Sequence, residues 1–501
     1  MSKKLVFLTG ATGTMGMESL KKFMENQDKF TLRVLARPSE ANKAKLAPYQ
    51  DKIEIIWGDL NEPEALHEGV KGADYVLHVG AILSPICDGK PELAMYTNYG
   101  STLYMLDSIR KLGQTETTHF VYIGTLAETG DRRAPIHWGR VGDPLKPSVY
   151  DYYAISKCCA ERAVIESGLK YWVSIRQSGM LPSSTVGRYY PIISHNPFNN
   201  PWEWSTAKDS GNLMCNVCKD EVPEEFWGKC YNLSSGASFR STTYSHNLFL
   251  GSDQRETYEP KWVALGNFHG QFYLDADKLE EMVPFRCQSY AEVRDEALKG
   301  YMAMAKAAAA KDPNYKPMTK AETKALNKEV CSKEDGVLQF VRDWDEERIK
   351  VWFDSVEKYK ALPEDWKDYP LYVPCAAPTK LDHGFDESKP VSELGYEDLK
   401  QAAEFRGGKL LSTEMTTGDM KTKKKFRCAF GHEFEATPNL VFFTGHWCPD
   451  CLCDDWNYGA QAQVNPFFNQ VWEPLHKGED PYSVKMECDG RKVEEKLGLK
   501  P

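Results

Sequence analysis

Leu5-Val-Phe-Leu-Thr-Gly-Ala-Thr-Gly-Thr-Met-Gly16 is the stretch that decides the fold. Its apolar residues predict a buried parallel strand, three glycines follow, and Met17 to Met24 has an amphipathic helical pattern. In this order the first glycine permits a tight turn and the second lets the backbone approach a pyrophosphate. The third lets helix and strand pack closely, with the phosphates at the helix N-terminus. A glycine turn alone is weak evidence, but this context predicts a dinucleotide site.

Length and composition limit the class of protein. A chain of 501 residues is too long for one ordinary core, so we expect a large domain with additions. Hydrophobic content of 42% with 27% charged residues is typical of soluble globular proteins, and a net charge of −10 argues against a general nucleic-acid binder. We expect no membrane span and no signal peptide. The 14 cysteines then favour reduced thiols and metal ligation, and a cytoplasmic location.

Further strands alternate with helical patterns after the glycine turn. This alternation predicts an α/β fold with a Rossmann-type, doubly wound parallel sheet. His78 lies within an apolar strand, where a core histidine is expected before a ligand. The additional predicted strands are Thr31 to Ala36, Ile53 to Trp57, Tyr75 to Val79 and Phe120 to Ile123.

The end of the second strand bears on the choice of cofactor. An acidic residue there usually holds the ribose hydroxyls of NAD, whereas an arginine suits the 2′-phosphate of NADP. This chain has Arg37, with Arg33 and Lys43 nearby, so we expect NADP(H), with NAD(H) as the second choice. A solvated basic loop is the alternative interpretation. Asp59 follows the third strand, where it could receive the adenine amino group.

A tyrosine and a lysine lie four residues apart in Tyr150-Asp-Tyr-Tyr-Ala-Ile-Ser-Lys157. On a helix this spacing places Tyr153 and Lys157 on one face. A free tyrosine titrates near ~10, and an adjacent ammonium favours the phenolate and lowers that pKa. The pair occurs by chance in many helices, so alone it proves little. Tyr150 and Tyr152 are expected to pack or to face the substrate.

Taken together, these motifs resemble the extended short-chain dehydrogenase/reductase superfamily, of the NAD-dependent epimerase/dehydratase type. The resemblance covers residues 1–300 and ends near Leu274-Asp-Ala-Asp-Lys-Leu279. It predicts a cofactor-binding part over 1–178 and a small substrate lobe mainly over 179–300. The motifs that carry it are Thr9 to Gly16, Gly58-Asp59-Leu60, His78 to Ala81, Asn98, Gly124-Thr125 and Tyr153 to Lys157.

The resemblance implies roles for individual residues. Tyr153 would be the general acid and base, and Lys157 would bind the nicotinamide ribose and lower the tyrosine pKa. Thr125 would hydrogen-bond the substrate oxygen, and Asn98 matches a structurally important asparagine grouped with these catalytic residues. The cofactor would contact Gly10, Thr12, Gly13, Thr14, Met15, Gly16, Arg37, Asp59, Leu60, Gly80, Tyr153 and Lys157.

The chain departs from the family pattern at two positions. Gly124-Thr125 replaces the usual serine pair, but a threonine hydroxyl can do the same work. Gln177 replaces the proline expected after Arg176, so the resemblance does not predict the conformation of the substrate-side turn.

The substrate lobe is rich in aromatic residues, among them Phe198, Trp202 and Trp204. They favour an apolar or ring-bearing substrate, although aromatic residues also simply pack. Cys215 and Cys218 fall in a helical pattern and are expected to face a core rather than a metal.

Residues 301–373 predict a helical extension with an apolar stripe. That stripe must be buried either against the first domain or across a homodimer interface. Residues 374–460 form a linker and a zinc-ribbon-like module, and 461–501 a C-terminal tail.

Four residues of the module have the spacing of a tetrahedral structural zinc site, namely Cys428, His432, Cys448 and Cys451. Cys453 and His446 are substitute ligands, and unmetallated core cysteines are the alternative. The module resembles a recurrent small zinc ribbon of obscure role, and Asn439 to Phe443 reads as a strand within it. The nearby basic run Lys421 to Lys425 is expected to be a solvated loop rather than a nucleic-acid contact.

The sequence therefore predicts an NADP(H)-dependent oxidoreductase that transfers a hydride between nicotinamide and a small carbonyl or alcohol. An epimerase or dehydratase that recycles its nicotinamide is the alternative within the enzymes. A dinucleotide-sensing regulatory or scaffold protein is the alternative outside them.

Overall fold

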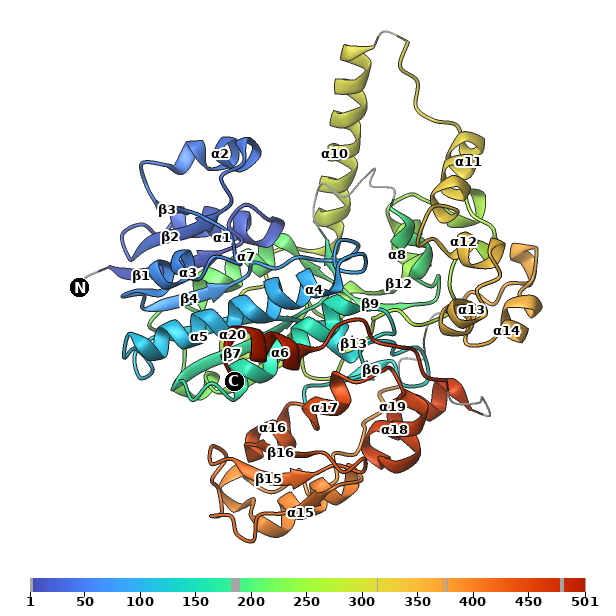
Figure 1. The fold of residues 1–501 in the computed structure, drawn as a ribbon. Coiled ribbons are helices and arrows are strands. Elements are labelled where there is room, and N and C mark those ends of the chain that lie inside the picture. The colour runs from blue at the N-terminus through green and yellow to red at the C-terminus, as the bar shows by residue number, and fades with distance from the viewer. Residues whose placement is uncertain are drawn as a thin grey trace.

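The computed structural model describes residues 3–181, 190–312, 314–372, 374, 377–477 and 482–500. Within them, seven strands form one parallel sheet in the order β11-β7-β5-β4-β1-β2-β3 (Figure 1). This order confirms the predicted doubly wound sheet, whose crevice lies where the order reverses, between β1 and β4. The strands are β1 (Lys4–Thr9), β2 (Phe30–Ala36), β3 (Glu54–Trp57), β4 (Tyr75–His78), β5 (His119–Thr125), β7 (Tyr171–Gln177) and β11 (Lys229–Leu233).

Helices cover both faces of this sheet. Side chains alternate along a strand, so Val6 and Leu8 of β1 point to one face and Phe7 to the other. The first face packs against α1 (Thr14–Met24) and α7 (Ala207–Asn216). Cys215 and Cys218 belong to this core, as predicted. The second face packs against α3 (Pro63–Val70), α5 (Ser101–Lys111) and α6 (Tyr152–Ile165).

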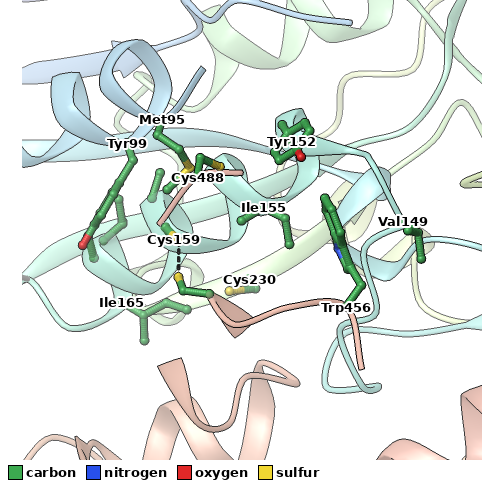
Figure 2. Packing of buried hydrophobic residues seen from close by; sticks show 14 of the residues in the cluster. Met95, Tyr99, Val149, Tyr152, Ile155, Cys159, Ile165, Cys230, Trp456 and Cys488 are labelled. Carbon is green, nitrogen blue, oxygen red and sulfur yellow. Dashed lines mark hydrogen bonds between the residues drawn. The ribbon is translucent and has the colours of Figure 1, made fainter. Parts of the chain in front are cut away.

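The helix α6 is buried on nearly all sides. Asp151 caps it by accepting the Ala154 N–H at 2.8 Å, and Tyr153 is its one half-buried residue, with the others buried. A helix on a sheet normally leaves a polar face in water. Here that face is covered by the C-terminal part of the chain, from which Trp456 and Cys488 pack against α6 (Figure 2).

Short strand pairs and small helices build the lobe beside the sheet. The pairs are β8 (Met180–Leu181) with β10 (Ser205–Thr206), β9 (Pro201–Glu203) with β12 (Arg240–Thr242), and β6 (Trp138–Gly139) with β13 (Phe272–Tyr273). The small helices of this part are α4 (Pro91–Ala94), α8 (Thr243–Phe249) and α9 (Asp277–Met282).

The helical extension packs against the first domain, which is one of the two expected arrangements. Phe340 and Trp352 join the main core, and the Leu265 N–H bonds the Trp352 carbonyl at 2.9 Å. None of the described helices is both long and apolar enough to cross a bilayer. The extension comprises α10 (Tyr290–Lys311), which projects from the body in Figure 1, then α11 (Lys320–Cys331), α12 (Val337–Arg342), α13 (Glu346–Phe353) and α14 (Val356–Ala361).

A small antiparallel sheet forms the centre of the C-terminal module, with strands β14 (Lys409–Leu410), β15 (Lys424–Arg427) and β16 (Glu433–Ala436). The strand predicted at Asn439 to Phe443 is wrong, because this segment is the helix α16 (Pro438–Phe443). The Thr437 side chain caps it and proline occupies its first turn, signals that outweigh a short apolar run. The other helices are α15 (Tyr396–Phe405), α17 (Pro449–Leu452), α18 (Tyr458–Val464), α19 (Pro466–His476) and α20 (Gly490–Leu497).

Trp456 offers a test of the contact between the C-terminal part and α6. Its ring is 1% exposed and lies 5.7 and 5.2 Å from the rings of Tyr150 and Tyr152. We expect Trp456→Ala to lower the free energy of unfolding by about 3–5 kcal/mol, measured by urea denaturation. Trp57→Ala, at a ring that is 42% exposed, should change it by about 0.5 kcal/mol. Equal losses would contradict the packing described.

Candidate functional site

The glycine turn brings the ends of β1 and β4 into backbone contact. Gly10 has a φ of +72°, and a Cβ there would lie 2.8 Å from the backbone of Gly80. A Cβ on Gly16 would lie 2.1 Å from the Gly10 carbonyl oxygen. Neither position tolerates a side chain, so both glycines are explained by close approach. No side chain caps the N-terminus of α1, which leaves its N–H groups available to an anion.

A cavity of about 710 Å³ opens at the carboxyl ends of the strands. All twelve residues predicted to contact the cofactor line it, and Thr125 lines it too. The structure thus brings the glycine turn, the end of β2 and the Tyr153–Lys157 pair to one cavity. Lining residues that were not predicted include Asn42, Lys45, Asn61, Ser178, Met180 and His269.

The end of β2 presents basic groups to this cavity. Arg37 is exposed and lines it, as does Lys45, whose ammonium bonds the Thr12 carbonyl at 2.9 Å. The other two cations considered from the sequence have partners elsewhere: Arg33 pairs with Glu54 at 2.9 Å, and Lys43 with Glu40 at 2.8 Å. At this end of the cavity, Arg37 and Lys45 are therefore the cations that line the wall.

Tyr153 and Lys157 lie one turn apart on α6, and Thr125 ends β5 beside them. The Thr125 hydroxyl accepts the Ala127 N–H at 3.2 Å, which fixes its orientation and leaves its proton to donate. The Lys157 ammonium lies 4.1 Å from the centroid of the Tyr122 ring. Three polar groups thus converge on one end of the cavity.

Burial changes the expected ionisation of this pair. Burial raises the pKa of Tyr153 above its ordinary value, and a hydrogen bond with Thr125 opposes that rise. Burial also lowers the pKa of Lys157 to about 8, while Glu128 and Glu161 oppose that change. Desolvation is the largest cause acting on Tyr153 and raises its pKa, opposite in direction to the lowering that was predicted from Lys157.

Asn98 and Gln177 hold the walls of the site. The Asn98 side chain receives the Ile82 N–H at 2.9 Å and donates to Ser156 at 3.0 Å, so it ties the loop after β4 to α6. Asn98 is not among the described residues that line the cavity. Gln177 does line the cavity, and its amide oxygen accepts the Ser210 hydroxyl at 2.9 Å. It links β7 to the substrate lobe.

His78 is a core residue, as expected. Its ring nitrogens lie 3.0 Å from the Thr9 hydroxyl and 3.3 Å from the Ser101 hydroxyl, and burial lowers its pKa. Both nitrogens are thereby occupied, which leaves none for a ligand.

One residue that fixes the Thr125 backbone was not identified from the sequence. Glu128 is fully buried, and its carboxylate accepts the Thr125 N–H at 2.9 Å. Thr125-Leu-Ala-Glu128 is a capping box, a pattern of threonine followed three residues later by glutamate that the sequence does display.

A second candidate site lies in the C-terminal module. The four predicted ligands converge, with their donor atoms all within 4.8 Å of one another. The Cys451 sulfur lies 3.8 Å from that of Cys428 and 3.4 Å from His432 Nδ1, and the Cys448 sulfur lies 3.6 Å from the same nitrogen. A tetrahedral zinc ion with bonds of ~2.0–2.3 Å separates its ligands by roughly 3.5–3.8 Å. The set therefore fits zinc.

The two substitute ligands have other partners. His446 bonds Glu161 at 2.9 Å, and the Cys453 sulfur lies 3.6 Å from that of Cys159 (Figure 2). Neither belongs to the four-residue cluster. Cys448 also accepts the Cys451 N–H at 3.5 Å, a contact that turns both sulfurs toward one point.

Several known proteins are similar to the first part of this chain. Residues 6–200 match the NAD dependent epimerase/dehydratase family. A UDP-glucose 4-epimerase from Rickettsia bellii (strain RML369-C) is 30% identical over 100 residues, which is 19% of this chain and 29% of that protein. Sanguinarine reductase from Eschscholzia californica is 43% identical over 77 residues, 15% of this chain and 27% of that protein. The matches thus span less than a third of either relative.

Solved structures with a similar fold include the dTDP-glucose 4,6-dehydratase of Streptomyces venezuelae, at 19% identity and a TM-score of 0.47. The similarity covers 60% of this chain and 97% of that one. The L-threonine 3-dehydrogenase of Trypanosoma brucei is 17% identical with a TM-score of 0.46, over 60% and 98% of the two chains.

The metal cluster gives a direct prediction. We expect about one equivalent of zinc in freshly purified protein and less than about half an equivalent in Cys448→Ser. The melting temperature of this variant should also fall, because metal binding supplies folding free energy of the order of 10 kcal/mol in small zinc modules. Elemental analysis and thermal denaturation measure both quantities. Cys287→Ser, at an exposed cysteine outside the cluster, should keep its zinc. Zinc content below about half an equivalent in the unaltered protein would contradict the site.

Proposed function

We propose that this protein is an NADP(H)-dependent oxidoreductase that acts on a small carbonyl or alcohol substrate. The observation that carries the proposal is the single cavity shared by the glycine turn, Arg37 and the group Thr125, Tyr153 and Lys157. The match of residues 6–200 to a family of NAD-dependent enzymes supports it.

The chain's own residues would handle the proton and the substrate oxygen. The nicotinamide, when bound, donates or accepts the hydride. A tyrosine is protonated at neutral pH, so Tyr153 can give a proton to the oxygen of a carbonyl that is being reduced. Thr125 would donate a hydrogen bond to the same oxygen. Lys157 is mostly protonated below pH 8 and favours the phenolate that proton transfer leaves behind.

The cavity walls support an apolar or ring-bearing substrate. Ile82, Leu83, Leu93 and Met180 line them, with His269 as a polar neighbour. The similarity to a protein named as a reductase also favours net reduction.

An epimerase or dehydratase is the second candidate, because the other relative is named as an epimerase. A net oxidoreductase consumes added NADPH in proportion to product, whereas an enzyme that recycles its cofactor does not. The zinc cluster would be structural, since four protein ligands close a tetrahedral site. The homodimer and the cytoplasmic location stay predictions.

Tyr153→Phe tests the proposed acid. With a panel of small aldehydes and ketones, we expect kcat to fall about 10²–10⁴-fold, measured by the loss of NADPH absorbance, while the Kd for NADPH changes little. Tyr150→Phe is the matched control, because the Tyr150 hydroxyl bonds Glu347 and does not line the cavity. If Tyr153→Phe keeps every measurable activity while the cofactor still binds, the sensor alternative gains and the proposed mechanism is wrong.

Arg37→Ala tests the cofactor preference. A charge-assisted contact with the 2′-phosphate contributes about 1.5–3 kcal/mol, so NADPH should bind at least about tenfold tighter than NADH, and the preference should vanish in the variant. Lys43→Ala, whose ammonium pairs with Glu40, should keep the preference. The dissociation constants of NADPH and NADH, measured at one ionic strength, give this preference. Equal affinities in the unaltered protein would refute the assignment of NADP(H).

A further inference from the structure

Three ionisable side chains form a fully buried network next to Thr125, Tyr153 and Lys157. Arg176 donates to the Glu161 carboxylate through Nε at 3.0 Å and through its terminal nitrogen at 2.6 Å. Its Nε also lies 3.2 Å from the Glu128 carboxylate. None of the three side chains is exposed to solvent. Buried charges of this kind depend on every partner that they have, because no water replaces a lost one.

This network supports two groups of the proposed active site. Glu128 accepts the Thr125 N–H at 2.9 Å and so fixes the backbone that carries the Thr125 hydroxyl. Glu128 and Glu161 both favour the charged form of Lys157 against its burial. A shift of either carboxylate would therefore move Thr125 or change the charge near Lys157.

The C-terminal module completes the network. The Thr444 carbonyl accepts a bond from Arg176 at 2.7 Å, and His446 Nε2 lies 2.9 Å from the Glu161 carboxylate. Gly445 between them has a φ of +79°, and a Cβ there would lie 2.0 Å from the Asp143 carbonyl oxygen. This segment, residues 444–446, therefore fits against the first domain with no room for a side chain at its centre.

We propose that the C-terminal module is a working part of the active site, with Thr444 and His446 as positioning residues. His446 contacts Glu161, and the Thr444 carbonyl accepts a bond from Arg176. Arg176 in turn lies beside Glu128, which accepts the Thr125 N–H. The assignment rests on the proposed function, since it gives Thr125 and Lys157 their importance. It adds a role for His446, which lies in a part of the chain outside the family match.

Other contacts between the module and α6 provide matched controls. The Thr437 hydroxyl bonds Glu166 at 2.8 Å, and Arg162 bonds the Trp447 carbonyl at 2.7 Å. Glu166 follows α6 and, within the described residues, bonds neither Glu128 nor Arg176. Thr437→Val therefore removes a docking contact and the cap of α16, but it leaves every side chain of the network in place.

Hydrogen exchange of the full-length protein with its metal tests the proposal without any cofactor. The Thr125 amide is a direct probe because its N–H donates to Glu128. In His446→Ala we expect peptides over residues 124–129 to exchange about tenfold faster, with β1 peptides unchanged. His446→Gln, whose amide nitrogen can occupy the place of Nε2, should restore protection. Thr437→Val should leave these peptides at the rate of the unaltered protein.

A second measurement tests whether the network affects cofactor binding. We expect His446→Ala to weaken NADPH binding by about tenfold, and Thr437→Val and His446→Gln to leave it within about twofold. If His446→Ala does not fold, His446→Asn replaces it, because its shorter side chain stops before Glu161.

The outcomes separate the two proposals. Unchanged exchange at 124–129 in the disrupting variant, or an equal increase in Thr437→Val, would overturn the positioning role. Failure of the unaltered protein to bind NADPH or NADH would refute the proposed function, while the exchange measurement would still decide the network.

Discussion

The ion pair between Arg176 and Glu161 is the interaction on which the site depends. Both groups are completely buried, so each must find all its partners within the protein. A buried pair adds little stability over apolar packing, yet breaking it costs about 3–5 kcal/mol because one charge is left unpaired. Here the partners come from β7, α6 and the C-terminal module. The pair therefore selects one arrangement of sheet, catalytic helix and module, and the Thr125 backbone follows from that arrangement through Glu128.

Local rules explain what could be predicted from the sequence. The glycine turn, the strand ends and the spacing of Tyr153 and Lys157 depend on neighbours within a few residues, and the structure places them in one cavity. The cluster of possible metal ligands was also identifiable, because Cys428, His432, Cys448 and Cys451 approach one point through two short turns. Spacing encodes such sites because each turn has few possible conformations.

Long-range contacts explain which features could not be predicted from the sequence. His446 is only a substitute metal ligand in the sequence interpretation, and its partner in the fold is Glu161, 285 residues away in the chain. Trp456 packs against Tyr152 of α6 from an equally distant part of the chain. Desolvation by burial also raises the pKa of Tyr153. Asn98 could be recognised as important, but its contacts with Ile82 and Ser156 appear only in the fold. Desolvation depends on what finally covers a group, which a local pattern does not contain.

The C-terminal module and the parallel sheet should unfold as one cooperative unit. Urea unfolding of the zinc- and NADPH-loaded protein tests it most directly, with zinc release followed by a chromogenic chelator and cofactor release by NADPH fluorescence. The buried network predicts coincident transitions, because the module cannot leave without exposing Glu161 and Arg176. Release of zinc in an earlier transition, with NADPH still bound at its original affinity, would contradict the claim.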